Sequence, residues 1–356
     1  MCEFLREWPE ARATVLSLEL LRTYRHPLIG ANVPSDDRNR GVNRTKPDRW
    51  KEDILQSVDM YNDWFLKFAP TAYRKTRIKT TKDVESTLIK TKNLTDVSPA
   101  VLKQEPGVLP TLRMATCPPL AVDRLIGLAS VSRNLIGCME GGEIPQRMNA
   151  ALVEKELNKI GAIIERMADP DIFVWLGRKA SATDPEIHRA ATIVADRLCG
   201  SVANPIIRNA QEKRQLARIG AWLQARGYSA LAPKTKFDAM PLGTFGFHLN
   251  VPVKREGLAP TINIPVDAVV MPKKAKRDEL PLLIEAKSAG DYTNVNKRRK
   301  EEAAKMSQLR VTYGSRVRFI LFLCGYFDSG YLGYEAAEGI DWVWEHRIDE
   351  LAKFGL

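Results

Sequence analysis

The sequence predicts an α/β protein whose mixed β-sheet is flanked by helices and preceded by a mainly helical N-terminal region. Three observations support this fold class. Apolar residues recur at helical spacing through the N-terminal half, the pattern changes to alternation after Gly227, and helical spacing returns between two alternating segments. Because 356 residues exceed the usual size of one domain, we divide the chain into a helical region, residues 1–200, and a sheet-containing core, residues 201–356.

The first predicted helix runs from Pro47 to about Pro70, because aromatic and aliphatic residues recur there every three or four positions. Pro70 is expected to end it, since proline disrupts the helical hydrogen-bond pattern. Pro205 suits a first turn and Gly227 a helix end. Further helices are therefore expected over residues 120–140, 146–168, 185–199 and 205–226.

In the C-terminal region, alternating apolar residues predict strands over residues 245–253, 261–271 and 282–287. Helical spacing follows over residues 296–313, and a largely apolar strand over 316–324. A helix, three strands, a helix and a strand in this order predict a mixed sheet with helices on its faces.

The chain is basic, with 54 Lys and Arg against 43 Asp and Glu and a formal net charge of +11. A positive charge on a protein of ordinary composition favours a polyanionic partner such as nucleic acid, although many basic proteins bind none. Hydrophobic residues at 44% and charged residues at 27% argue against wholesale disorder and against residence in a membrane.

The five cysteines lie far apart and show no CxxC spacing, which argues against a disulfide framework and a structural zinc site. The four histidines show no metal-ligand spacing either. Charged residues interrupt the N-terminus where a signal peptide needs an apolar run, and no later segment has the length of a membrane span. We therefore expect a cytoplasmic protein with reduced thiols.

Three ionisable residues interrupt two apolar strands. Because side chains alternate along a strand, Asp267 is expected on the face opposite Ile264, Val266 and Ala268. Glu285 and Lys287 share one face of the next strand, about 7 Å apart. Burying such charges unpaired costs several kcal/mol, so they are expected to have partners.

Two carboxylates from neighbouring strands form an oxygen site that suits Mg²⁺, and a lysine beside the ion can orient or help deprotonate an attacking water. These residue types are sufficient for hydrolysis of a phosphodiester bond. The alternative is a surface ion pair between Glu285 and Lys287 on an edge strand. That alternative leaves Asp267 unexplained.

Asp267, followed after 18 residues by Glu285-Ala286-Lys287, resembles the PD-(D/E)xK nuclease motif, although Pro265 lies one residue further from the aspartate than the motif places its proline. The resemblance implies that Asp267 and Glu285 bind a divalent metal, that the backbone carbonyl of Ala286 adds a ligand, and that Lys287 serves the nucleophile. It also implies a further acidic residue on the helix before the sheet.

Glu212, within RNAQEKRQLARIGAWLQARGY, fits that acidic position. An exposed glutamate paired with Arg208 or Lys213 is the alternative.

Four cations open the helix after Lys287, an order that opposes the helix dipole but suits contact with phosphates. Asparagine and arginine there can also read base edges, and a merely solvated helix start is the alternative. The basic segment after Pro70 is either a solvated face or an arm that contacts the DNA backbone. The candidate DNA-binding residues are Asn294, Asn296, Lys297, Arg298, Arg299, Arg74 and Arg77.

Residues 58–77, 109–142 and 285–305 resemble the XamI-type restriction endonucleases. This resemblance implies a type II restriction enzyme that acts as a homodimer on a palindromic DNA site, GTCGAC, and cuts to leave a 5′ overhang. A modification methyltransferase is implied to act on the same site without binding the enzyme. Residues 1–200 would then serve DNA binding and dimerisation, and residues 201–356 catalysis. A structure-specific repair nuclease of the same superfamily and a non-catalytic DNA-binding protein are the alternatives.

Overall fold

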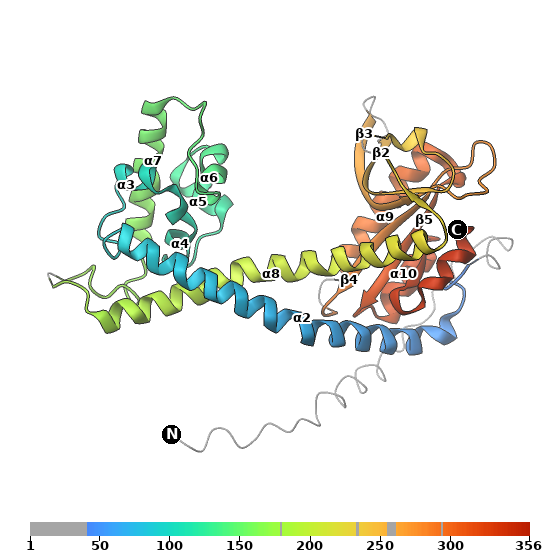
Figure 1. Cartoon of the computed structure of the whole chain (residues 1–356), viewed down its shortest axis with the longest axis horizontal. Helices are drawn as coiled ribbons and strands as arrows, with labels where there is room; N and C mark the ends of the chain where they lie inside the picture. Colours follow the sequence, from blue (N-terminus) through green and yellow to red (C-terminus); the bar gives the residue numbers. More distant parts are fainter. Residues whose placement is uncertain (1–40, 179, 233–234, 255–260, 293–294) are drawn as a thin grey trace, which may run out of the picture.

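The computed structural model describes residues 41–356 except residues 179, 233–234, 255–260 and 293–294. It contains a helical lobe and a sheet lobe, which two long helices connect (Figure 1). These helices, α2 (Pro47–Lys90) and α8 (Asp184–Ala225), pack against each other between the lobes. None of the described helices is long and apolar enough to cross a membrane.

The helical lobe surrounds an apolar core that includes Leu109, Leu125, Leu135 and Ile160, each completely buried. Ser132 and Asn149 cap two of its helices by accepting hydrogen bonds from backbone N–H groups of the first turn. Its elements are α3 (Pro99–Gln104), η1 (Pro106–Val108), α4 (Leu109–Met114), α5 (Val122–Ala129), α6 (Arg133–Glu140) and α7 (Ala150–Met167).

Three helix boundaries differ from the prediction. Helix α2 continues through Pro70 to Lys90, and α8 is one helix that includes Pro205. An internal proline costs roughly 3 kcal/mol, and the extensive packing between these two helices offsets that cost. Residues 120–140 form two helices, because Ser130 adopts a left-handed conformation with φ 49°. Helix α8 continues through residue 200, where the sequence predicted a boundary between two regions. The division into residues 1–200 and 201–356 therefore stays a prediction.

Among the described residues, the sheet has six strands in the order β1-β2-β3-β4-β5-β6. Strands β2, β3 and β4 run antiparallel to their neighbours in this group, whereas β1 is parallel to β2, and β4, β5 and β6 are mutually parallel. The predicted α/β class with a mixed sheet is therefore confirmed. The strands are β1 (Ser229–Ala230), β2 (Thr244–Lys254), β3 (Thr261–Val270), β4 (Leu282–Ala289), β5 (Arg318–Gly325) and β6 (Asp341–Trp344).

Helix α9 (Val295–Tyr313) lies between β4 and β5, close to its predicted bounds. The pattern did not predict α10 (Ser329–Ala337) or β6, because both are short. Three short 3₁₀ segments complete this lobe: η2 (Phe237–Ala239), η3 (Gly314–Arg316) and η4 (Glu345–Phe354).

Apolar cores cover both faces of the sheet. Ile284 of β4 packs in the core that contains Ile219 of α8, whereas Leu283 packs in the core that contains Met306 and Leu309 of α9. By alternation, Glu285 shares the α9 face with Leu283. Helices α8 and α9, which precede and follow the motif in the sequence, therefore lie on opposite sides of β4.

The predicted alternation is wrong for β3. Ile264 and Val266 pack in the core on the α9 side, whereas Ala268 packs in the core on the α8 side. The change occurs at Asp267, whose register position on β2 is that of His248, a residue with φ 51°. The left-handed residue interrupts the regular geometry of β2, and the regular alternation of side chains in β3 is broken at the same level.

Candidate active site

Asp267 lies where β3 and β4 separate. The pairing of the two strands ends where Ala268 lies opposite Ile284. The residue that follows on β4 is Glu285, and the residue at the same level on β3 is Asp267. An Oδ2 atom of Asp267 accepts a hydrogen bond of 2.8 Å from the backbone N–H of Ala286. The structure therefore brings the predicted aspartate to the motif on β4.

Glu285 and Lys287 form an ion pair, with 3.0 Å between Nζ and Oε1. Their strand is internal, because β4 lies between β3 and β5, and Glu285 is only 3% exposed. The alternative of a surface ion pair on an edge strand is therefore wrong. The same Oε1 atom accepts a hydrogen bond of 2.6 Å from Lys305 of α9, which also donates to the carbonyl oxygen of Pro265.

A second buried acid, Glu302 of α9, lies beside Lys287. Its side chain is 1% exposed, and 3.3 Å separate its Oε1 from Nζ of Lys287. The sequence motif did not include Glu302 or Lys305. A signal for Glu302 was available, because it precedes the buried Met306 and Leu309 by four and seven residues and so lies on the apolar face of its helix.

Burial and neighbouring charges shift the pKa values of the acidic and basic groups in this site. Burial and the neighbouring Glu285 raise the pKa of Asp267 to about 6, although the hydrogen bond from Ala286 opposes the shift. Burial raises the pKa of Glu302 to about 7. For Lys287, burial lowers the pKa, but the charges of Glu285 and Glu302 outweigh it and the net pKa is raised. Such concentrated, perturbed groups are typical of functional sites.

Glu212 of α8 also lies next to Asp267. One side-chain oxygen from each of these residues and one imidazole nitrogen of His248 all lie within 4.8 Å of one another. The carboxylate of Glu212 is 3.8 Å from Nε2 of His248. Sequence spacing could not reveal His248, because only the register of β2 with β3 brings it opposite Asp267.

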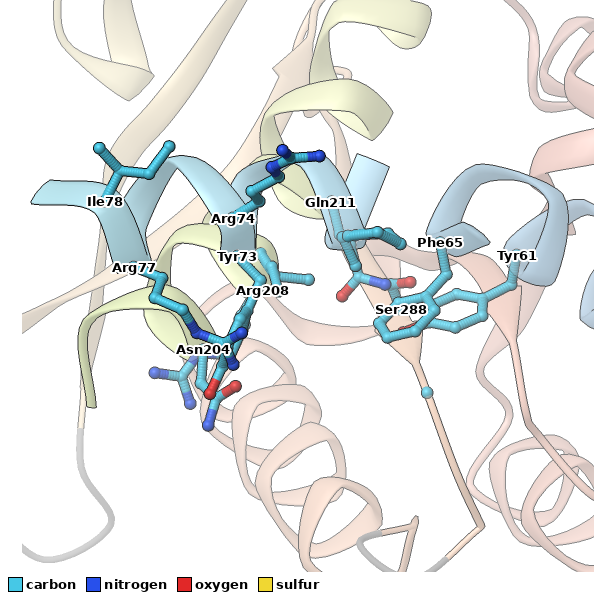
Figure 2. Close-up of a pocket in the computed structure, with 14 residues that line it drawn as sticks. Tyr61, Phe65, Tyr73, Arg74, Arg77, Ile78, Asn204, Arg208, Gln211 and Ser288 are labelled. Atoms are coloured by element: carbon cyan, nitrogen blue, oxygen red, sulfur yellow. The ribbon is translucent and has the colours of Figure 1, made fainter. Parts of the chain in front are cut away.

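Arg74 and Arg77 of α2 line a groove of about 910 Å³ between α2 and α8 (Figure 2). Arg208 on the facing helix adds a third guanidinium group, and Ser288 at the end of β4 also lines the groove. Arg77 forms an exposed ion pair with Asp196 at 2.9 Å. The groove is therefore rich in positive charge, and one of its lining residues directly follows Lys287 in the sequence.

The basic segment after β4 is only partly described. Asn294 lies outside the described residues, and the side chains of Asn296, Lys297 and Arg298, in the first turn of α9, also lie outside the description. The guanidinium group of Arg299 lies 3.7 Å from the centre of the Tyr334 ring on α10. This cation–π contact gives Arg299 a defined position near the start of α9.

The donor set of this site suits a hard divalent cation. Glu212, His248 and Asp267 are the described side chains whose ligand atoms lie within 4.8 Å of one another, and Glu285 lies beside Asp267 on the adjacent strand, with Oε2 buried and without a hydrogen-bond partner among the described residues. A buried carboxylate oxygen without a partner is costly unless a cation satisfies it. The residues therefore fit a metal ion, and the adjoining lysine and arginines fit a phosphodiester substrate.

This combination of mixed sheet, paired carboxylates, lysine and cationic groove is the arrangement expected of a hydrolase that cleaves nucleic acid. The family model for the XamI restriction endonuclease matches residues 92–344. The chain is also 51% identical to the type II restriction enzyme SalI of Streptomyces albus G over 319 residues, which cover 88% of this chain and 99% of that relative. The chain belongs to the XamI restriction endonuclease family.

Membership of this family makes the chain a site-specific restriction endonuclease that binds DNA, and restriction enzymes of type II generally need a divalent metal. No solved structure matches the chain.

Proposed function

We propose that the chain is a PD-(D/E)xK endonuclease that uses Mg²⁺ to hydrolyse both strands of duplex DNA at the palindrome GTCGAC. The observation that carries the proposal is the convergence of Asp267 and Glu285 from adjacent strands, with Lys287 paired to Glu285 at 3.0 Å. The identity with the type II restriction enzyme SalI over almost the whole of that relative supports the sequence specificity.

Asp267 and Glu285 would hold the ion, with the backbone carbonyl of Ala286 as a further ligand and Glu212 beside Asp267. When bound, the ion would supply Lewis acidity at the phosphate and acidify a coordinated water. Lys287 orients the nucleophile and holds positive charge next to the scissile phosphate. The apolar cores on both faces of β4 limit access of bulk water to these groups.

DNA would reach the site along positively charged surfaces on both sides of the end of β4. Arg74, Arg77 and Arg208 in the groove between α2 and α8 would contact phosphates. The start of α9 follows the catalytic strand directly, so its polar residues would contact phosphates or base edges near the cut. These residues are Asn296, Lys297, Arg298 and Arg299, together with Asn294, which precedes α9 in the sequence and lies outside the described residues.

We further propose that two copies form a homodimer, because a palindromic site presents the same half-site twice and a two-fold symmetric enzyme matches it. In the cytoplasm, a separate methyltransferase would modify the same sequence and protect the host DNA. Light scattering of the purified protein tests the dimer, with a mass of about twice 40.0 kDa expected.

The experiment that tests the function is digestion of two linear DNA fragments, one with a single GTCGAC and a second with that site scrambled. We expect two discrete products with 5′ overhangs from the first fragment, only with Mg²⁺, and no products with EDTA. Cleavage of branched DNA without regard to sequence would support a structure-specific nuclease instead. Tight binding without cleavage at any Mg²⁺ concentration would contradict both enzymatic functions.

A further inference from the structure

Glu302 occupies an unusual position for a glutamate. It is 1% exposed on the face of α9 that packs against the sheet, and neither carboxylate oxygen has a hydrogen-bond partner within the described part of the chain. Its close ionic contact is with Nζ of Lys287 at 3.3 Å. A buried carboxylate in this setting costs free energy that an apolar residue of similar size would avoid.

Lys287 has two acidic neighbours that differ in their other contacts. Oε1 of Glu285 lies 3.0 Å from its ammonium group and also accepts a hydrogen bond from Lys305. In the proposed reaction, Glu285 is a metal ligand, so part of its charge is directed toward the ion. Glu302 is not among the proposed metal ligands, and its carboxylate lies 3.3 Å from the ammonium group of Lys287.

We propose that Glu302 is a positioning residue for the nuclease reaction: from α9, its buried carboxylate fixes the ammonium group of Lys287 toward the scissile phosphate. The inference rests on the proposed function of Lys287. The physical reason is that a lysine side chain has four rotatable bonds, and the reaction needs its ammonium group in one place. Two carboxylates at 3.0 and 3.3 Å restrict it more than one does.

The alternative is that Glu302 merely braces α9 against the sheet. The two interpretations predict different effects of Glu302→Gln, which keeps the size of the side chain and removes its charge. A bracing residue affects how much protein is folded. A positioning residue affects the rate at which each folded, DNA-bound molecule cleaves.

The test is single-turnover cleavage of a GTCGAC fragment with saturating enzyme and Mg²⁺. The amplitude measures the active fraction, and the rate constant measures catalysis. We expect Glu302→Gln to lower the rate constant by about 10- to 100-fold, with unchanged amplitude and with DNA affinity in Ca²⁺ changed by less than about twofold. Glu302→Asp, which keeps the charge, should lose less rate than Glu302→Gln.

Glu156 provides a control, because it is also a buried glutamate but lies on α7 in the helical lobe. Glu156→Gln should leave the rate constant unchanged. The inference is overturned if Glu302→Gln cleaves at the parent rate, if its loss lies in amplitude or DNA affinity, or if Asp and Gln lose the same rate. Absence of cleavage by the parent protein would instead refute the proposed function, so the two failures are distinguishable.

Discussion

The carboxylate of Asp267 accepts a hydrogen bond from the backbone N–H of Ala286 at the level where β3 and β4 stop pairing. The side chain thus replaces a backbone acceptor and joins the two strands. The contact fixes Asp267 beside Glu285, and it also leaves the second oxygen of Asp267 able to bind a cation. The site therefore lies at the point where the two strands separate.

Asp267→Asn tests the role of this carboxylate separately from its contact with Ala286. The amide oxygen of asparagine can still accept the hydrogen bond, so we expect the folded structure to persist. Loss of the negative charge should reduce metal-dependent cleavage by at least about 100-fold. Cleavage rates with Mg²⁺ and thermal unfolding of the variant provide the measurement. A variant that cleaves within about tenfold of the parent would contradict a metal-binding role for Asp267.

The groove arginines should contribute electrostatic affinity for DNA. We expect the double variant Arg74→Ala, Arg208→Ala to bind duplex DNA more weakly and to lower the slope of log affinity against log salt by about 2. Fluorescence anisotropy over a range of NaCl concentrations measures both quantities. Lys51→Ala, which removes an exposed cation from α2 outside the groove, is the control. Equal salt slopes for the double variant and the parent would exclude the groove from the DNA path.

Glu335 should make stability depend on pH. Burial and the charge of Glu302 raise the pKa of Glu335 to about 8, whereas the unfolded chain has a value of about 4.3. As pH rises, the carboxyl group of Glu335 therefore loses its proton in the unfolded state before it does so in the folded state. The contribution of Glu335 to the free energy of unfolding falls as pH rises from about 5 through 8. We expect Glu335→Gln to gain stability relative to the parent over this range, as measured by urea unfolding. A difference that stays constant with pH would contradict the shift.

Asp341 attaches the start of the described chain to the sheet. Its buried carboxylate accepts hydrogen bonds from the backbone N–H groups of Val42, Asn43 and Arg44, immediately before α2. Asp341→Ala leaves these donors without their acceptor and should lower the free energy of unfolding by about 2–4 kcal/mol. Asp59→Ala, at an exposed position of α2, should change it by less than about 0.5 kcal/mol. Equal stability of the two variants would show that Asp341 does not anchor α2.

The sequence was sufficient to predict the strands that carry the site, because alternation and the spacing of Asp267, Glu285 and Lys287 are local properties. Other features depend on tertiary contacts. The packing of α2 against α8 allows both helices to continue through their prolines, which local propensity opposes.

The remaining site residues come from elements that only the fold brings together. His248 reaches Asp267 through the register of β2 with β3, and Lys305 reaches Glu285 because α9 packs on one face of the sheet. The predicted alternation of side chains also failed at Asp267, because the side chains of β3 change there from one face of the sheet to the other. A pattern with a period of two cannot represent such a local break in the strand.

The proposed centre of metal-dependent DNA cleavage is Lys287 with its two carboxylate neighbours. Its most direct test is the cleavage rate of a GTCGAC fragment by the parent and by Lys287→Ala, each with Mg²⁺, with DNA binding measured in Ca²⁺. We predict discrete products from the parent and a loss of at least about 100-fold in the variant, with DNA binding retained. Undiminished cleavage by a folded Lys287→Ala variant would contradict this site as the catalytic centre.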